Sequence, residues 1–469
     1  KEQGRKTILV RTETTPDDVH GMIAAEGILT QKGGATSHAA VVARGMGKPC
    51  VAGCEAIRID LQNRRANVNG TELREGDWIT IDGTTGNVAI GELRLIPPPS
   101  QLPGWLATFL SWADELRRMQ VWANADTPDD AAKARELGAQ GIGLCRTEHM
   151  FMQPERLPIV HAMILANSAA ERGKALEKLL PFQRDDFGGI LAAMQGLPVT
   201  IRLLDPPLHE FLPSLEQLLV ETTELRLTQG IESEEYRTKE AMLRRVQQLH
   251  EQNPMLGLRV CRLGIVFPEI YEMQVRAIFE AACELRRRGM DVRPDVMIPG
   301  VGTKEEMQTT REAAKRVADE TLARENVALT YHIGTMIELP RACIVAGELA
   351  KEAEFFSFGT NDLTQTTYGY SRDDAEGSFI PVYLEKHILK EDPFQVLDRR
   401  GVGHLMQEAV TSGRAARADL KIGICGEHGG EPSSVAFCDA LGLDYVSCSP
   451  YRVPIARLAA AQSAIGAIS

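Results

Sequence analysis

A histidine loop at residues 32–49 has the clearest capacity for chemistry in this chain. Two glycines at its start allow positive φ angles and close approach to a ligand. Thr36 and Ser37 are candidate N-caps of a helix over residues 39–44. His38 would then lie in the first helical turn, where free N–H groups and the helix dipole favour a phosphate group. A neutral imidazole is a competent nucleophile near pH 7, so the loop indicates phosphoryl transfer through His38 rather than a capping or packing role.

Charged residues follow several short apolar runs further along the chain. Arg146, Arg202 and Arg259 are candidates to bind phosphate and carboxylate oxygens, because guanidinium groups match both in a two-pronged geometry. Glu338 and Asp362 are candidate ligands of Mg2+, a hard ion that proteins bind through one or two carboxylates. Any one of these arginines alone would more often be an ion-pair partner. Their convergence at one end of a fold would indicate a site for a metal-bound anion.

Cys425 is the cysteine most suited to chemistry. It lies in a glycine-rich segment at the end of an apolar run, where a packing role would contribute little. A thiol with a near-neutral pKa is a suitable proton donor, and Ser357 and Tyr445 are candidates to orient it. Gly359, Thr360 and Asn361 complete the candidate site residues of the later part of the chain.

These residues must be positioned by a fold, and the pattern after residue 104 predicts a (β/α)8 barrel. Short apolar runs alternate with longer amphipathic segments, which favours parallel strands with helices between them. A helical insertion at about 211–250 should follow the third strand. The predicted strands are 120–123, 141–144, 198–203, 257–260, 295–298, 333–337, 355–358 and 421–424.

A small α/β domain is expected before the barrel. Residues 7–10, 27–30 and 49–52 are β-like, and residues 78–90 have the alternation and glycine pattern of a hairpin. Three consecutive prolines favour a semi-rigid spacer after it. The expected domains are therefore 1–96, a linker at 97–112 and the barrel at 113–469.

Composition narrows the functional class. The chain has 469 residues, of which 43% are hydrophobic, and a formal net charge of −12. Lys and Arg balance Asp and Glu in residues 1–96, so the acidic excess lies in the barrel and argues against nucleic acid or anionic membranes as partners. Nine cysteines without a CxxC pair indicate reduced thiols and a cytosol-like, cytoplasmic location.

The loop Gly33-Gly34-Ala35-Thr36-Ser37-His38, followed by Ala-Ala-Val-Val-Ala-Arg-Gly, resembles the phosphohistidine loop of the phosphoenolpyruvate (PEP)-utilising enzymes. The resemblance extends over essentially the whole chain and includes the segments 143–151, 359–365 and 423–430. It implies that His38 takes the phosphoryl group of PEP and that Cys425 protonates the resulting enolate to pyruvate. Mg2+ and the substrate would be held by the barrel residues named above.

The resemblance is strongest to the member that makes PEP, AMP and diphosphate from pyruvate, ATP and phosphate. It implies an N-terminal nucleotide-binding domain before Lys1, a swinging histidine domain and a homodimer formed through the barrel. In plant members phosphorylation of the threonine that matches Thr36 switches the enzyme off. Alone, the present chain should catalyse only the PEP/pyruvate half of the cycle.

Three alternatives stay open. PEP synthase typically has Cys where this chain has Ser37. The PEP-dependent phosphotransferase of a carrier protein has a helical insert for which residues 1–96 leave no room. A catalytically silent phosphocarrier fragment would have no need of the histidine, both carboxylates and the cysteine together.

Overall fold

The computed structural model describes residues 6–14, 18–34, 37, 39–40, 43, 48–61, 63–68, 70–83, 85–95, 103–166, 168–249, 251, 253–376 and 378–468. Thr36, His38 and the three spacer prolines lie outside the described residues. The chain divides into two units, one of Lys1–Pro103 with Gly369–Gln395 and one of Gly104–Tyr368 with Val396–Ser469. The domain limits expected from the sequence stay predictions.

Short strands dominate the first unit. A parallel sheet has the order β1-β2-β3, and an antiparallel sheet and a hairpin follow it. The β-like runs and the hairpin expected from the sequence are present, whereas the antiparallel sheet was not foreseen. The elements are β1 (Ile8–Arg11), α1 (Val19–Ala24), β2 (Gly27–Thr30), β3 (Cys50–Val51), β4 (Ile57–Asp60), β5 (Arg65–Val68), β6 (Thr71–Arg74), β7 (Ile79–Asp82) and β8 (Asn87–Ile90).

The segment Gly369–Gln395 of this unit holds two short helices, α16 (Arg372–Glu376) and α17 (Ile380–Glu385). Ala375, Ile380 and Phe394 form a small apolar core between them.

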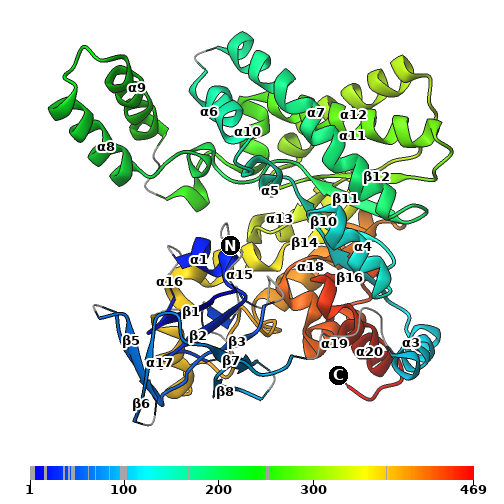
Figure 1. The fold of residues 1–469 in the computed structure, drawn as a ribbon. Coiled ribbons are helices and arrows are strands. Elements are labelled where there is room, and N and C mark those ends of the chain that lie inside the picture. The colour runs from blue at the N-terminus through cyan, green and yellow to red at the C-terminus, as the bar shows by residue number, and fades with distance from the viewer. Residues whose placement is uncertain are drawn as a thin grey trace. The chain divides into compact units, whose positions relative to one another are not determined.

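Eight parallel strands close into a barrel in the second unit, which confirms the predicted fold class (Figure 1). In order around the ring they are β9 (Gln120–Asn124), β10 (Ile142–Arg146), β11 (Pro198–Arg202), β12 (Arg293–Ile298), β13 (Ile333–Ile337), β14 (Phe355–Phe358), β15 (Lys421–Ile424) and β16 (Tyr445–Cys448).

Two of the strand assignments made from the sequence need correction. The predicted strand 257–260 does not exist, because Arg259 is the N-cap of α10 and Val260 has φ +54°, which no strand residue adopts. The missing eighth strand is β16, which pairs with β15 and β9 and closes the ring. The total of eight was therefore right although one member was wrong.

Helices surround the ring, and their ends follow local chemistry. Thr303 and Glu306 form a capping box at the start of α12, and Asn326 ends it in the left-handed conformation. The helices are α3 (Gly104–Leu116), α4 (Pro128–Glu136), α5 (Glu148–Phe151), α6 (Leu157–Leu165), α7 (Ala169–Ala193), α8 (Leu215–Thr228), α9 (Glu234–Leu249), α10 (Val260–Val266), α11 (Pro268–Arg287), α12 (Lys304–Glu325), α13 (Pro340–Ile344), α14 (Ala346–Leu349), α15 (Thr360–Tyr368), α18 (Val402–Ala416), α19 (Pro432–Ala440) and α20 (Val453–Ala464).

Three of these helices bear on the sequence predictions. The pair α8 and α9 is the predicted insertion between the third and fourth strands. Helix α3 packs on α20 and begins inside the range 97–112 that was expected to be linker.

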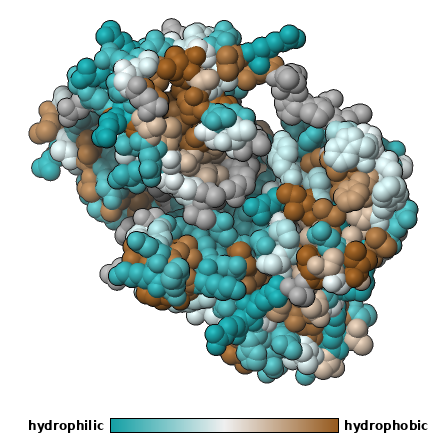
Figure 2. All heavy atoms as spheres, turned by 90° about the horizontal axis from the view of Figure 1, so that it is seen from below, coloured by the Kyte–Doolittle hydropathy of each residue, from teal (hydrophilic) through white to brown (hydrophobic). Residues whose placement is uncertain are grey.

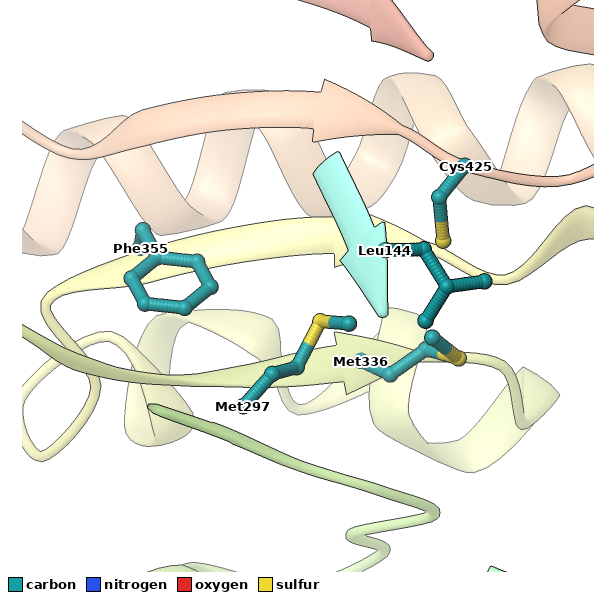
Figure 3. Close-up of a cluster of buried hydrophobic side chains, with 5 residues drawn as sticks. All are labelled: Leu144, Met297, Met336, Phe355 and Cys425. Carbon is teal, nitrogen blue, oxygen red and sulfur yellow. The ribbon is translucent and has the colours of Figure 1, made fainter. Parts of the chain in front are cut away.

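The barrel interior is filled by large side chains that face glycines. Figure 3 shows Leu144, Met297, Met336, Phe355 and Cys425 packed together inside the ring. Lower in the ring, the Trp122 and Tyr445 rings stack with their centroids 4.1 Å apart. A Cβ atom at Gly423 would lie 2.2 Å from the Tyr445 ring, so this strand position needs a glycine. The floor below the strand ends is therefore closely packed.

The molecular surface is mixed in polarity. On the face drawn in Figure 2, hydrophobic residues form separate patches between hydrophilic ones. Within the part of the chain that the structure describes, none of the helices has the length and apolarity needed to cross a membrane.

Candidate active site

A pocket of about 350 Å3 lies where the barrel strands end. The segments after β10, β11, β13, β14 and β15 all contribute to it. The sequence-predicted residues that line it are Arg146, Arg202, Arg259, Glu338, Gly359, Asn361, Asp362 and Cys425. Most come from strand ends as expected, but Arg259 enters from the N-terminus of α10.

Thr360 and Asn361 also make hydrogen-bond contacts that hold the edge of the pocket together. Thr360 is fully buried, and its Oγ1 lies 2.7 Å from Nδ1 of His428. The Asn361 Oδ1 atom accepts a hydrogen bond from the Glu427 backbone N–H at 3.0 Å. Both contacts tie the start of α15 to the loop after β15.

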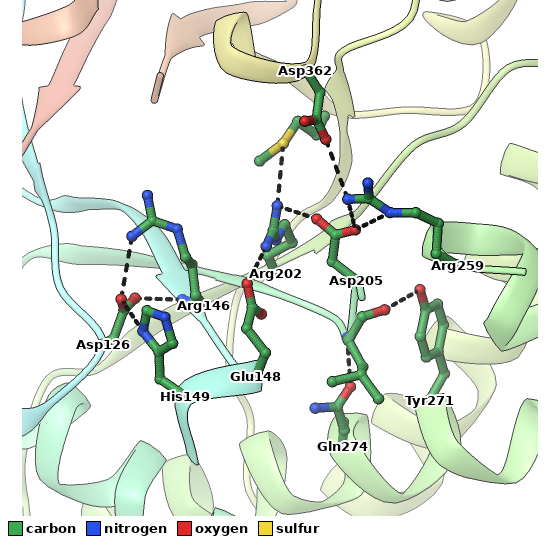
Figure 4. Close-up of polar contacts among 12 residues, drawn as sticks. Asp126, Arg146, Glu148, His149, Arg202, Asp205, Arg259, Tyr271, Gln274 and Asp362 are labelled. Atoms are coloured by element: carbon green, nitrogen blue, oxygen red, sulfur yellow. Dashed lines mark hydrogen bonds and ion pairs between the residues drawn. The ribbon is translucent and has the colours of Figure 1, made fainter. Parts of the chain in front are cut away.

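Asp205 is the centre of the ion-pair network in Figure 4, and sequence reasoning did not select it. Its two oxygens accept from Arg202 and Arg259, each at 2.5 Å. Arg202 also donates to Glu148 at 2.5 Å, and Arg259 lies 3.3 Å from Asp362. The sequence does place Asp205 three residues beyond Arg202, just after a buried strand, and this position could have marked it as a site residue.

Three carboxylates meet at one point of the pocket. The closest oxygens of Asp205, Glu338 and Asp362 all lie within 4.8 Å of one another. Burial, together with the neighbouring carboxylates, raises the pKa of Glu338 well above its usual range, and burial raises that of Asp362. Burial acts the same way on Asp205, but Arg202 and Arg259 bring its pKa below the ordinary value.

The donor set suits a hard cation. Among the residues that the structure describes, Oε1 of Glu338 is a buried oxygen that accepts no hydrogen bond. A buried carboxylate oxygen without a partner is costly, and oxygen-only ligand sets are those of Mg2+ and Ca2+. The cluster therefore fits a divalent ion.

Cys425 lies at the floor of this pocket and is 1% exposed. Burial raises the pKa of its thiol to about 11, although the Ser357 hydroxyl lowers it. The expectation of a near-neutral pKa is therefore wrong, because the thiol is enclosed in the barrel core. Cys425 keeps its proton throughout the neutral range, as a proton donor must.

Contacts behind the pocket hold the backbone next to Arg259 in place. The Tyr271 hydroxyl on α11 lies 2.8 Å from the carbonyl oxygens of both Leu204 and Val260. The Val260 N–H donates to the Asp205 carbonyl at 2.8 Å. A β-branched residue at positive φ is strained, so these contacts stabilise a backbone that would otherwise relax and move Arg259.

On the opposite side of the pocket, Asp126 holds Arg146. One oxygen of Asp126 accepts from the Arg146 backbone N–H at 2.7 Å, and the other lies 3.3 Å from its guanidinium. His149 Nδ1 lies 2.8 Å from that second oxygen. His149 lies in the segment 143–151 that carries the family resemblance, but the sequence alone indicates no role for it.

The histidine loop belongs to the first unit, and its described residues agree in part with expectation. Gly33 has φ +109°, and a Cβ atom at Gly53 would lie 2.3 Å from the Gly33 carbonyl oxygen. Ser37 Oγ accepts from the Ala40 N–H at 3.4 Å, a typical N-cap contact. His38 lies outside the described residues, and its role stays a prediction.

The barrel brings three arginines and a cluster of three carboxylates together in one pocket at its strand ends. Residues 102–465 match the PEP-binding domain of the PEP-utilising enzymes, and residues 4–86 match their mobile domain. The chain therefore belongs to the PEP-utilising enzyme family.

Among curated relatives, it is 57% identical to pyruvate, phosphate dikinase 1, chloroplastic, of Arabidopsis thaliana, which covers 98% of this chain and 47% of that protein. It is 56% identical to pyruvate, phosphate dikinase 2 of Zea mays, with 98% and 51% covered. The same identity is found with the chloroplastic enzyme of Flaveria pringlei, with 98% and 47% covered. The chain spans about half the length of the curated relatives it matches.

Proposed function

We propose that this chain transfers a phosphoryl group between PEP and pyruvate through a phosphohistidine at His38. The observation that carries the proposal is the meeting of three arginines, three carboxylates and a protonated thiol in one pocket at the strand ends. A substrate with a phosphate and a carboxylate group matches this set. The identity to dikinases over 98% of the chain favours this reaction over that of PEP synthase or of the carrier-protein phosphotransferase.

In the proposed reaction an imidazole nitrogen of His38 attacks phosphorus. The N–P bond forms as the P–O bond to the enol oxygen breaks, and that electron pair leaves with the enolate. Arg146, Arg202 and Arg259 neutralise the phosphate and carboxylate oxygens. The Cys425 S–H then donates its proton to the methylene carbon of the enolate, which gives pyruvate, and the thiolate regains a proton from water.

Glu338 and Asp362 would hold Mg2+, with Asp205 beside them. When bound, the ion neutralises phosphate and enolate oxygens. Arg202 and Arg259 already share the charge of Asp205, which leaves Glu338 and Asp362 as the better ligands.

The wider cycle also belongs to the proposal. With a nucleotide-binding domain, the same histidine would be charged from ATP and phosphate and would pass its phosphoryl group to pyruvate. A homodimer through the barrel, regulation at Thr36 and a cytosol-like location stay predictions. The plant relatives named above include chloroplastic proteins.

The test is incubation of the chain with PEP labelled in its phosphoryl group, in the presence of Mg2+, followed by peptide mapping. We expect acid-labile label on the peptide that contains His38, with one pyruvate released per label. A His38→Ala variant should take up none. Label on another residue would refute the role of His38, and no label in the parent chain would favour a catalytically silent phosphocarrier fragment.

A further inference from the structure

Arg146 and His149 share one carboxylate oxygen. The Arg146 guanidinium lies 3.3 Å from Oδ2 of Asp126, and Nδ1 of His149 lies 2.8 Å from the same atom. Figure 4 shows Asp126 between the two side chains. Both Arg146 and His149 line the pocket. A cation held by a shared oxygen at 3.3 Å is held weakly, since charge-assisted pairs normally close to 2.7–2.9 Å.

We propose that His149 is a positioning residue, which through Asp126 sets how freely Arg146 can bind the substrate anion. In its protonated form His149 takes the shared oxygen and leaves the Arg146 guanidinium available to a substrate oxygen. In its neutral form it competes less, so Asp126 binds Arg146 more tightly, and the pocket loses one positive charge. Both effects weaken anion binding. The inference rests on the proposed function, because it takes PEP to be the anion.

His149 is placed to respond to pH. Its side chain is about half exposed at the pocket edge, so solvent protons reach it. The hydrogen bond to Asp126 raises the pKa of His149 above its ordinary value, and the Glu148 charge acts in the same direction. The charged groups that act on the pair, from its own helix and from neighbouring elements, are Asp126, Arg146, Glu148, Arg202 and Glu427.

The sign of the effect follows from this environment. The protonated form predominates below the ordinary histidine value of 6.5 and is lost as pH rises through the raised pKa. A phosphate monoester has its second pKa near 6, so most of it is doubly ionised above the ordinary histidine value. Affinity for PEP should therefore fall as pH rises through the raised pKa of His149, while the small remaining gain in substrate charge acts in the opposite direction.

The test measures binding of PEP to the full chain by calorimetry from pH 6.5 to 9, at saturating Mg2+. A His38→Ala background prevents phosphoryl transfer, so that binding alone is observed. We expect the dissociation constant to rise about fivefold or more over this range, a coupling typical of linked sites. His149→Asn keeps a donor for Asp126 but cannot titrate. It should therefore give a flat profile at the weaker value, and His149→Gln should confirm it.

A matched control exists at the other end of the barrel. His332 Nδ1 lies 2.9 Å from Asp295, and this hydrogen bond also raises the pKa of His332. His332→Asn should leave the binding profile unchanged. A flat profile in the parent, an unaltered slope in both His149 variants, or an equal effect of His332→Asn would overturn the inference. Failure of the parent to bind PEP at pH 6.5 would instead contradict the proposed function itself.

Discussion

Removal of the Tyr271 hydroxyl group tests how the contacts behind the pocket position Arg259. Tyr271→Phe keeps the ring in α11 and deletes only the oxygen that lies 2.8 Å from the Leu204 and Val260 carbonyls. Tyr271 is buried, and burial raises its pKa well above 10, so in the parent the hydroxyl remains a donor at every working pH. Its single proton is shared by two acceptors.

The magnitude can be worked from these contacts. Loss of a buried donor that serves two carbonyls should reduce the free energy of unfolding by about 1–3 kcal/mol. Val260 at φ +54° stores strain of about 1–3 kcal/mol, which favours relaxation of the backbone once the Tyr271 hydroxyl group is removed. A shift of about 1 Å in Arg259 would lower kcat/KM by up to about 100-fold.

Two assays follow these effects separately. Urea unfolding measures stability, and PEP-dependent pyruvate release measures activity. Tyr331→Phe is the control, because the Tyr331 hydroxyl bonds Asp319 at 2.6 Å on the outer helix α12. It should lower stability slightly and leave activity unchanged. Full activity in Tyr271→Phe, or equal activity loss in both variants, would show that Tyr271 does not position Arg259.

Three further changes test the pocket and its floor. Glu338→Gln should raise the Mg2+ concentration for half-maximal pyruvate release by about tenfold or more, and an unchanged Mg2+ titration would exclude this carboxylate as a ligand. Cys425→Ala should slow pyruvate release by about 100-fold while calorimetry shows PEP binding retained; undiminished turnover would remove the proposed proton donor. Gly423→Ala puts a Cβ atom 2.2 Å from the Tyr445 ring and should cost about 1–3 kcal/mol in urea unfolding. Gly173→Ala, which meets nothing within 4 Å, should not lower stability, and equal losses would contradict the packing account.

The barrel could be predicted because its strands are short apolar runs between amphipathic helices. The exceptions were residues 257–260 and 445–448. The first has strand-like composition, but Val260 takes a left-handed conformation that only tertiary contacts impose. The second is only four residues long and follows the short helix α19 closely, so its sequence alone does not set it apart as a separate strand.

The candidate site could be predicted where a residue capable of chemistry ends a buried strand or directly follows one, as Arg146, Glu338 and Cys425 do. Asp205 and His149 could not be recognised from the sequence, because the role of each depends on residues that only the fold brings close. Asp205 pairs with Arg202 and Arg259, and His149 contacts Asp126. Cys425 was found, but its pKa was misjudged, since residue type alone does not report enclosure by the barrel core.

The most direct test of the central claim is exchange of labelled pyruvate into PEP, with Mg2+ and without nucleotide. If the phosphohistidine forms and reacts in both directions, the parent chain should incorporate label into PEP. The His38→Ala variant should incorporate none, although it still binds PEP. Exchange that persists without His38, or a parent chain that binds PEP and never exchanges, would contradict the account.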